Sequence, residues 1–93
     1  DRGRALVTQI GSLLAPIGAG SIGASGGGAD IGPSVEAGDI PAMSLEVDGS
    51  QYFLIHHTDA DTVDKIEPSD LARCVAAVAV MSYVVADMPH SLR

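Results

Sequence analysis

The sequence is poor in aromatic residues, in bases and in cysteine. Aromatic side chains make up 3% of the 93 residues, and tryptophan is absent. A core built on large rings is therefore excluded, and the abundant Ala, Val and Ile favour close packing of helices on a sheet. The single cysteine, Cys74, excludes an internal disulfide. Because a free cysteine usually behaves as a small buried residue, we expect Cys74 in the core.

Positive charge is also scarce, with 5 Lys and Arg against 12 Asp and Glu and a net charge of -7. Nucleic acids and anionic membranes attract clustered bases, so neither is expected as a partner. The apolar run from Val75 to Ala86 is shorter than the roughly 20 residues that a membrane span needs. We expect a buried helix there and no membrane segment.

The chain is long enough for one small domain at most. It begins at Asp1 without an initiating Met, and no signal peptide is visible. We expect residues 1–93 to be the C-terminal portion of one domain and not a complete domain. The last predicted helix is apolar nearly all round and needs cover on most sides. Missing elements of the same protein, or a second copy in a homodimer, would supply that cover.

Periodicity and turn residues outline the first half of the chain. Apolar spacings of three and four predict a helix over residues 4–14, which Pro16 ends. The glycine-rich stretch 18–32 is either a flexible linker or a loop that passes close to another segment. Pro33 is suited to open a short helix that Gly38 closes.

The second half combines predicted strands with a long helix. Residues 42–47 alternate apolar and polar as a strand does, and residues 52–55 extend a second strand or form an ordered loop. Glu67 and Pro68 begin the last helix, with acceptors and negative charge at its positive end. Helices alternating with strands indicate an α/β layer structure.

Two adjacent histidines, His56 and His57, end the apolar stretch. Neutral imidazole is the commonest protein ligand of transition metals. Adjacent residues on extended backbone point in opposite directions, so only one of the two can face a given metal. Asp61 or Thr58 could then fix the ring or the loop. A structural or surface-exposed histidine pair remains the alternative.

Neither the glycine-rich loop nor the acidic connection after His57 matches a known ligand-binding motif. The loop around Gly28 lacks the Gly-Lys-Ser/Thr ending of a phosphate loop and the context of a dinucleotide fingerprint. Asp30 in this loop is either held inward at a cleft or is a plain turn residue. Asp59, Asp61 and Asp64 lack the spacing and central glycine of a calcium loop, which favours a solvated acidic loop.

Several segments together resemble a family, the co-catalytic zinc exopeptidases. They are Gly27-Gly28-Ala29-Asp30-Ile31-Gly32-Pro33, Glu36-Ala37-Gly38, Tyr52-Phe53 followed by His57-Thr58-X-X-Asp61-Thr62, and Ala86-Asp87-Met88-Pro89. The resemblance is to the plasma glutamate carboxypeptidase or carboxypeptidase Q branch. More broadly, the chain is similar to zinc aminopeptidases and glutaminyl cyclases.

This resemblance implies the C-terminal part of an α/β/α sandwich enzyme that holds two zinc ions. Metal-activated water would hydrolyse peptide bonds of short peptides or dipeptides. The ligand position of the family matches His57, and His56 points elsewhere. The resemblance places five further residues in the substrate pocket or in support of the ligand: Asp30, Gly28, Tyr52, Asp61 and Thr58.

The resemblance also places the other four ligands and the catalytic Glu upstream of this chain. With no catalytic residue of its own, the isolated chain is expected to be inactive, because a catalytic zinc takes at least three protein ligands. The parent enzyme is expected to be secreted or periplasmic. Two alternatives stay open: a non-catalytic binding or structural module, and an acyltransferase of the glutaminyl cyclase kind.

Overall fold

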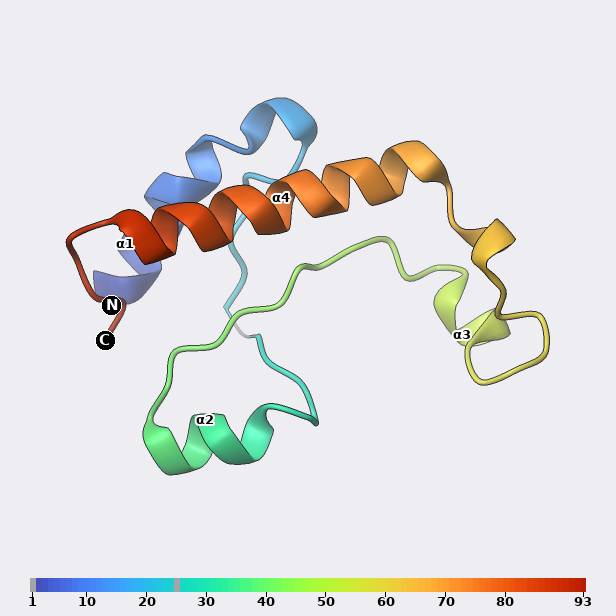
Figure 1. Cartoon of the computed structure of the whole chain (residues 1–93), viewed down its shortest axis with the longest axis horizontal. Helices are drawn as coiled ribbons and strands as arrows, with labels where there is room; N and C mark the ends of the chain where they lie inside the picture. The colour runs from blue at the N-terminus through green and yellow to red at the C-terminus, as the bar shows by residue number, and fades with distance from the viewer. Residues whose placement is uncertain (1, 25) are drawn as a thin grey trace.

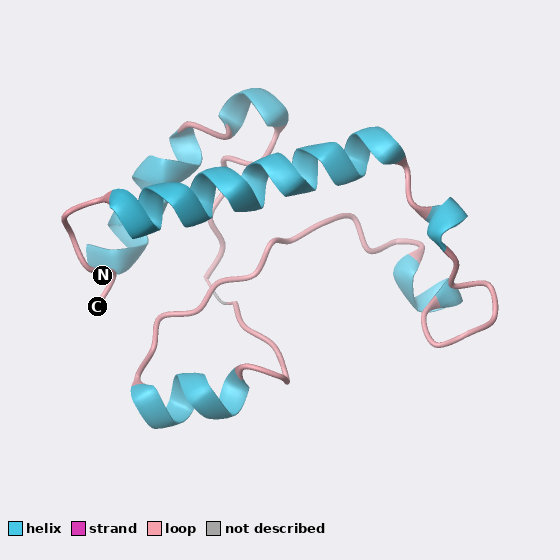
Figure 2. Cartoon of the chain, in the orientation of Figure 1, coloured by secondary structure: helices cyan, strands magenta, loops and turns pink. Residues whose placement is uncertain are grey.

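The computed structural model describes residues 2–24 and 26–93. This part of the chain is a series of helices and loops (Figure 1) and contains no strand (Figure 2). The elements in chain order are α1 (Arg2–Ser12), η1 (Ala15–Ile17), α2 (Gly32–Gly38), α3 (Tyr52–Ile55), η2 (Val63–Lys65) and α4 (Pro68–Asp87).

Helix α1 lies against the long helix α4, and this contact holds the small core. The buried apolar side chains are Val7 and Ile10 of α1, Leu14 just after it, and Ala77 of α4. The helical spacing of three and four between the first three residues produces this face. The predicted first helix is confirmed, and a 3₁₀ turn containing Pro16 follows it.

The two predicted proline-initiated helices are also confirmed. Helix α2 carries Pro33 in its first turn, where a missing backbone N–H costs nothing. Helix α4 begins after Glu67, whose carboxylate accepts a hydrogen bond of 3.0 Å from the Asp70 backbone N–H. The Ser69 hydroxyl donates to the same carboxylate. The predicted cap therefore forms as expected from the sequence.

The expectation of an α/β layer structure and an α/β/α sandwich is wrong for this chain. Residues 40–49 run as extended chain without a paired neighbour in the described part. Alternating side chains favour extended backbone, but a strand also needs the N–H and C=O groups of an adjacent strand. Residues 52–55, predicted as a second strand or an ordered loop, form the helical turn α3, which is closed by a 2.8 Å hydrogen bond from the His56 N–H to the Tyr52 carbonyl.

The glycine-rich loop crosses the extended segment at close range. A Cβ on Gly26 would lie 2.7 Å from the Cα of Met43, closer than real side chains come. Next to it, the Gly27 N–H donates to the Ser44 hydroxyl at 2.8 Å, and that hydroxyl donates to the Gly27 carbonyl at 2.7 Å. Of the two predicted alternatives, the loop that passes close to another segment is the one observed.

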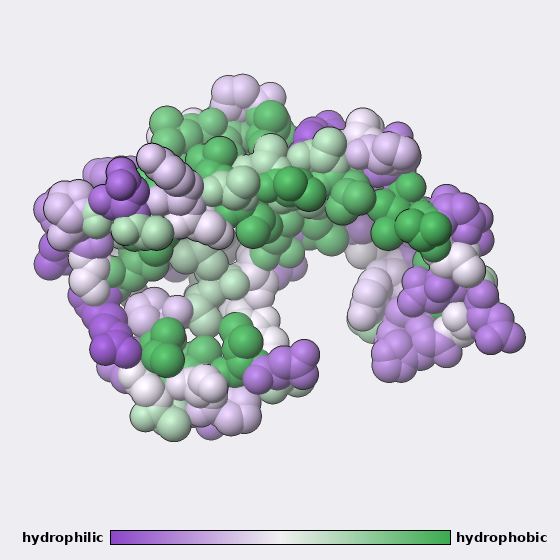
Figure 3. Space-filling view, viewed as in Figure 1, coloured by the Kyte–Doolittle hydropathy of each residue, from purple (hydrophilic) through white to green (hydrophobic). Residues whose placement is uncertain are grey.

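Most of the apolar surface remains uncovered. The accessible area is 7120 Å² for 9.4 kDa, whereas a compact monomer of this mass exposes about 5,000 Å². The radius of gyration is 15.1 Å, against about 13 Å for a compact 100-residue domain. Figure 3 shows apolar side chains along the length of α4 and a hollow beneath it, between the α2 and α3 regions.

Helix α4 is the most exposed apolar element. Val75, Val78 and Tyr83 are each at least half exposed, and the expected burial of this helix is not achieved within the described residues. Cys74 on the same helix is half-buried, not in the core as expected. By length and composition, α4 is also the one described helix that could cross a membrane. Helices in protein cores have the same length and composition.

Candidate functional site

The candidate site is the turn that follows α3. His56 ends the helix with extended backbone (φ -60°, ψ 138°), and His57 then adopts a left-handed conformation with φ 59°. Positive φ is uncommon for residues other than glycine and costs on the order of 1–3 kcal/mol. The His57 side chain is exposed. A strained backbone under an exposed imidazole makes this residue a functional candidate.

Thr58 closes the turn with its own hydroxyl and backbone. Its N–H donates to the Ile55 carbonyl at 3.0 Å, and its hydroxyl donates to the same oxygen. In return, the Ala60 N–H donates to the Thr58 hydroxyl at 3.3 Å, and the Asp61 N–H donates to the Thr58 carbonyl at 3.1 Å. These bonds fix the backbone on both sides of His57.

The acidic residues beyond the turn are held locally and face solvent. The Thr62 hydroxyl donates to the Asp64 carboxylate, and the Lys65 ammonium lies 3.4 Å from it. These two neighbours, Thr62 first, hold the pKa of Asp64 below its usual range. Asp59 and Asp61 are also exposed. The segment matches the solvated acidic loop expected from the sequence.

The two histidines have different environments. The His56 ring is half-buried and stacks on Tyr52, with centroids 4.8 Å apart and an angle of 14° between the planes. Its Nδ1 is covered by protein and has no hydrogen-bond partner among the described residues. The His57 ring is the exposed one, and the family resemblance assigns the metal to it. That assignment remains a prediction.

The structure does not bring Gly28 and Asp30, two of the predicted pocket residues, to His57. Asp30 is exposed in the turn before α2, where the Gly32 N–H donates to the Gly28 carbonyl at 2.9 Å. Figure 1 shows α2 and α3 well separated below α4. Within the described ranges, no group of three His, Cys, Asp or Glu side chains could hold a metal ion. His57 is thus a single potential ligand.

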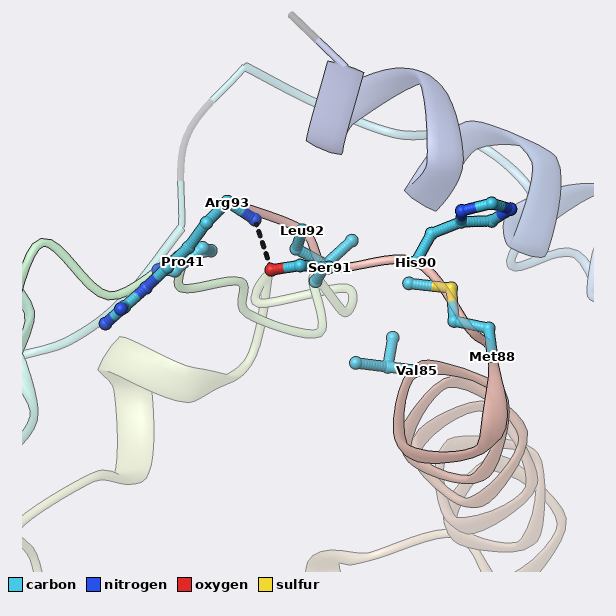
Figure 4. Close-up of a pocket in the computed structure, with 7 residues that line it drawn as sticks. All are labelled: Pro41, Val85, Met88, His90, Ser91, Leu92 and Arg93. Atoms are coloured by element: carbon cyan, nitrogen blue, oxygen red, sulfur yellow. Dashed lines mark hydrogen bonds between the residues drawn. The ribbon is translucent and has the colours of Figure 1, made fainter.

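An open groove of about 270 Å³ lies at the other end of α4 (Figure 4). Its lining residues are Pro41, Val85, Met88, His90, Ser91, Leu92 and Arg93. The Arg93 guanidinium donates to the Gly38 carbonyl at 3.0 Å and ties the C-terminal residues to the end of α2. This contact joins residues 55 positions apart, and no local sequence signal predicted it.

Comparison with known proteins gives one consistent result. No family model matches the chain, and no solved structure matches it significantly. Carboxypeptidase Q of Mus musculus is 36% identical over 92 residues, and that of Homo sapiens is 37% identical over 92 residues. Carboxypeptidase Q of Xenopus laevis is 40% identical over 89 residues.

These matches cover 96–99% of this chain but only 19% of each relative. The chain thus spans about a fifth of the length of the curated relatives it matches. The matches span almost the whole chain and confirm the resemblance seen in the sequence motifs. The chain is similar to carboxypeptidase Q over a segment that makes up about one fifth of such a protein.

Proposed function

We propose that this chain is part of a zinc-dependent metallo-exopeptidase, to which it supplies one metal ligand and part of the pocket wall. The observation that carries the proposal is 36–40% identity to carboxypeptidase Q over 96–99% of the chain. The conformation of His57 supports it, because an exposed imidazole sits on a strained, hydrogen-bonded turn. Residues 1–93 are then a portion of one catalytic domain.

The donor chemistry of His57 fits a metal ligand, since neutral imidazole is a preferred ligand of zinc. When bound, two zinc ions would polarise the scissile carbonyl and lower the pKa of the attacking water. Thr58 holds the His57 turn through its bonds to Ile55. Asp61, exposed four residues after His57, is the proposed support of the ligand.

The substrates we propose are short peptides or dipeptides. Gly28, Asp30 and Tyr52 would form part of the pocket wall once the rest of the domain is in place. The remaining ligands would come from the four fifths of the relatives' length that this chain does not match. The isolated chain is therefore expected to be inactive, and the intact protein to be secreted or periplasmic.

The test replaces His57 in the intact protein and measures dipeptide hydrolysis and bound zinc. His57→Ala should lower turnover roughly a hundredfold or more and reduce zinc content, because loss of a ligand exceeds the 10–100-fold effect of losing an outer support. His90→Ala is the matched control, since it removes an imidazole from the distant groove. Circular dichroism should show the same fold in both variants.

The same assays separate the alternatives. Near-normal turnover of His57→Ala would remove this residue from the ligand set. An intact protein that binds zinc without cleaving peptides would be a binding module. Cyclisation of peptides with N-terminal glutamine would indicate the acyltransferase alternative.

A further inference from the structure

Four rings form a cluster at the His57 turn. Tyr52 stacks on His56, and Phe53 meets the His56 ring edge-on, with centroids 5.3 Å apart and planes at 87°. The His57 ring lies against His56, with centroids 4.5 Å apart and planes at 53°. His56 is thus the central ring of the cluster and touches the other three.

The local helix geometry explains this arrangement. Tyr52 and His56 are four residues apart, the spacing that places two side chains on the same face of a helical turn. The hydrogen bond from the His56 N–H to the Tyr52 carbonyl keeps the two residues in register. The rings at positions 52 and 56 therefore stack on each other at the end of α3.

His56 is poorly placed to bind a metal through its Nδ1. That atom is covered and has no hydrogen-bond partner in the described part of the chain. Its ring surface is used in contacts with Tyr52, Phe53 and His57. The environment of His56 therefore favours ring packing, and this packing includes the His57 ring.

We propose that His56, backed by Tyr52, is a positioning residue that holds the His57 imidazole in its ligand orientation. This inference rests on the proposed function. An exposed histidine has several side-chain rotamers, and a ligand gains affinity when a supporting group limits them. The usual support is a hydrogen bond to the second ring nitrogen; here the support is ring packing from the preceding residue.

The experiment measures zinc affinity of the intact protein by competition with a chromogenic chelator. Tyr52→Leu and His56→Ala remove the stack, whereas Tyr52→Phe and His56→Phe keep a ring at each position. We expect the first pair to weaken zinc binding about tenfold to a hundredfold, the range for loss of a supporting group. The second pair should stay within about twofold of wild type on the same principle.

A second readout uses the metal-free protein. The χ1 coupling constants of His57 should move toward rotamer-averaged values in Tyr52→Leu and His56→Ala, because the neighbouring ring no longer restricts the imidazole. Zinc affinity within twofold of wild type in both Tyr52→Leu and His56→Ala would overturn the inference. Unchanged circular dichroism shows that the effect is local.

Two failures can be told apart. If His57→Ala loses zinc but Tyr52→Leu and His56→Ala do not, His57 remains a ligand and only the positioning role is wrong. If the wild-type protein binds no zinc at all, the proposed function fails and the positioning role fails with it.

Discussion

At His57 the backbone has a conformation that glycine adopts more easily. A left-handed residue after a helical turn is commonly glycine, which has no Cβ to clash with its own carbonyl. A histidine at φ 59° therefore raises the free energy of the backbone, so a functional role of its side chain would explain why it is found there. The contact between the His56 and His57 rings and the exposure of His57 agree with a chemical role for the His57 side chain.

Substitutions at His57 should separate the backbone from the side chain. In the metal-free protein, His57→Gly should equal or exceed the thermal stability of wild type, because the strain is relieved. His57→Val should be less stable than His57→Gly by about 1–2 kcal/mol, since β-branched residues resist this conformation. Equal melting temperatures for the two variants would contradict the assigned strain.

At the scale of elements, the glycine loop and the extended segment 40–49 depend on each other. Ser44 bonds both backbone groups of Gly27, and Gly26 leaves room for the backbone at Met43. The crossing fixes where the loop that carries Asp30 lies. Helix α4 is instead specified locally, by the Glu67 cap and Pro68.

Gly26→Ala should disrupt this crossing. The added Cβ would meet backbone atoms of Met43 and Ser44, which cannot rotate away. We expect a loss of about 1–3 kcal/mol in the free energy of unfolding, the usual cost of overpacking. Gly23→Ala is the matched control, since nothing lies within 4 Å of its added Cβ. Denaturant unfolding of both variants tests the difference, and equal loss would contradict it.

The cap of α4 should weaken in acid. The Ser69 hydroxyl and then the Asp70 N–H bond the Glu67 carboxylate and lower the pKa of Glu67. A lowered pKa means that the cap is fully present above the ordinary glutamate pKa of about 4.3. Its stabilisation is lost as the pH falls through the lower folded value.

The amide proton of Asp70 reports this titration, with a midpoint below the ordinary glutamate value. Glu67→Gln should abolish the transition while leaving an acceptor in place. A midpoint at or above the ordinary value would contradict the assigned hydrogen bonds.

At the scale of the whole molecule, the chain has more surface than a self-contained domain. The 7120 Å² of accessible area includes the long apolar face of α4. The four apolar side chains that are buried among the described residues give little core to offset the loss of chain entropy. Such a chain is expected to need further contacts, from the rest of its protein or from a second copy.

The isolated 93-residue chain should therefore self-associate. Sedimentation velocity should show dimers or larger species, and Val75→Asp with Val78→Asp should shift the distribution toward monomer by charging the exposed face. A monodisperse monomer with cooperative unfolding would contradict this expectation.

The sequence by itself determined three of the helices and the resemblance to carboxypeptidase Q. Apolar spacing, prolines and the Glu67 cap are local signals, so α1, α2 and α4 follow from neighbouring residues. The His57-Thr58-X-X-Asp61-Thr62 order indicated the resemblance that the carboxypeptidase Q matches confirm. The predicted sheet was wrong, because an alternating pattern at 42–47 cannot supply its own pairing partner.

Only the tertiary structure decided the environments of the two histidines. The sequence separated them by a resemblance and by an assumed extended backbone. The structure separates them by a helical turn that packs His56 on Tyr52 and by a left-handed residue that exposes His57. It also decided that Gly26 lies against Met43 and that Arg93 reaches Gly38. Such contacts join residues distant in the chain, and no local pattern encodes them.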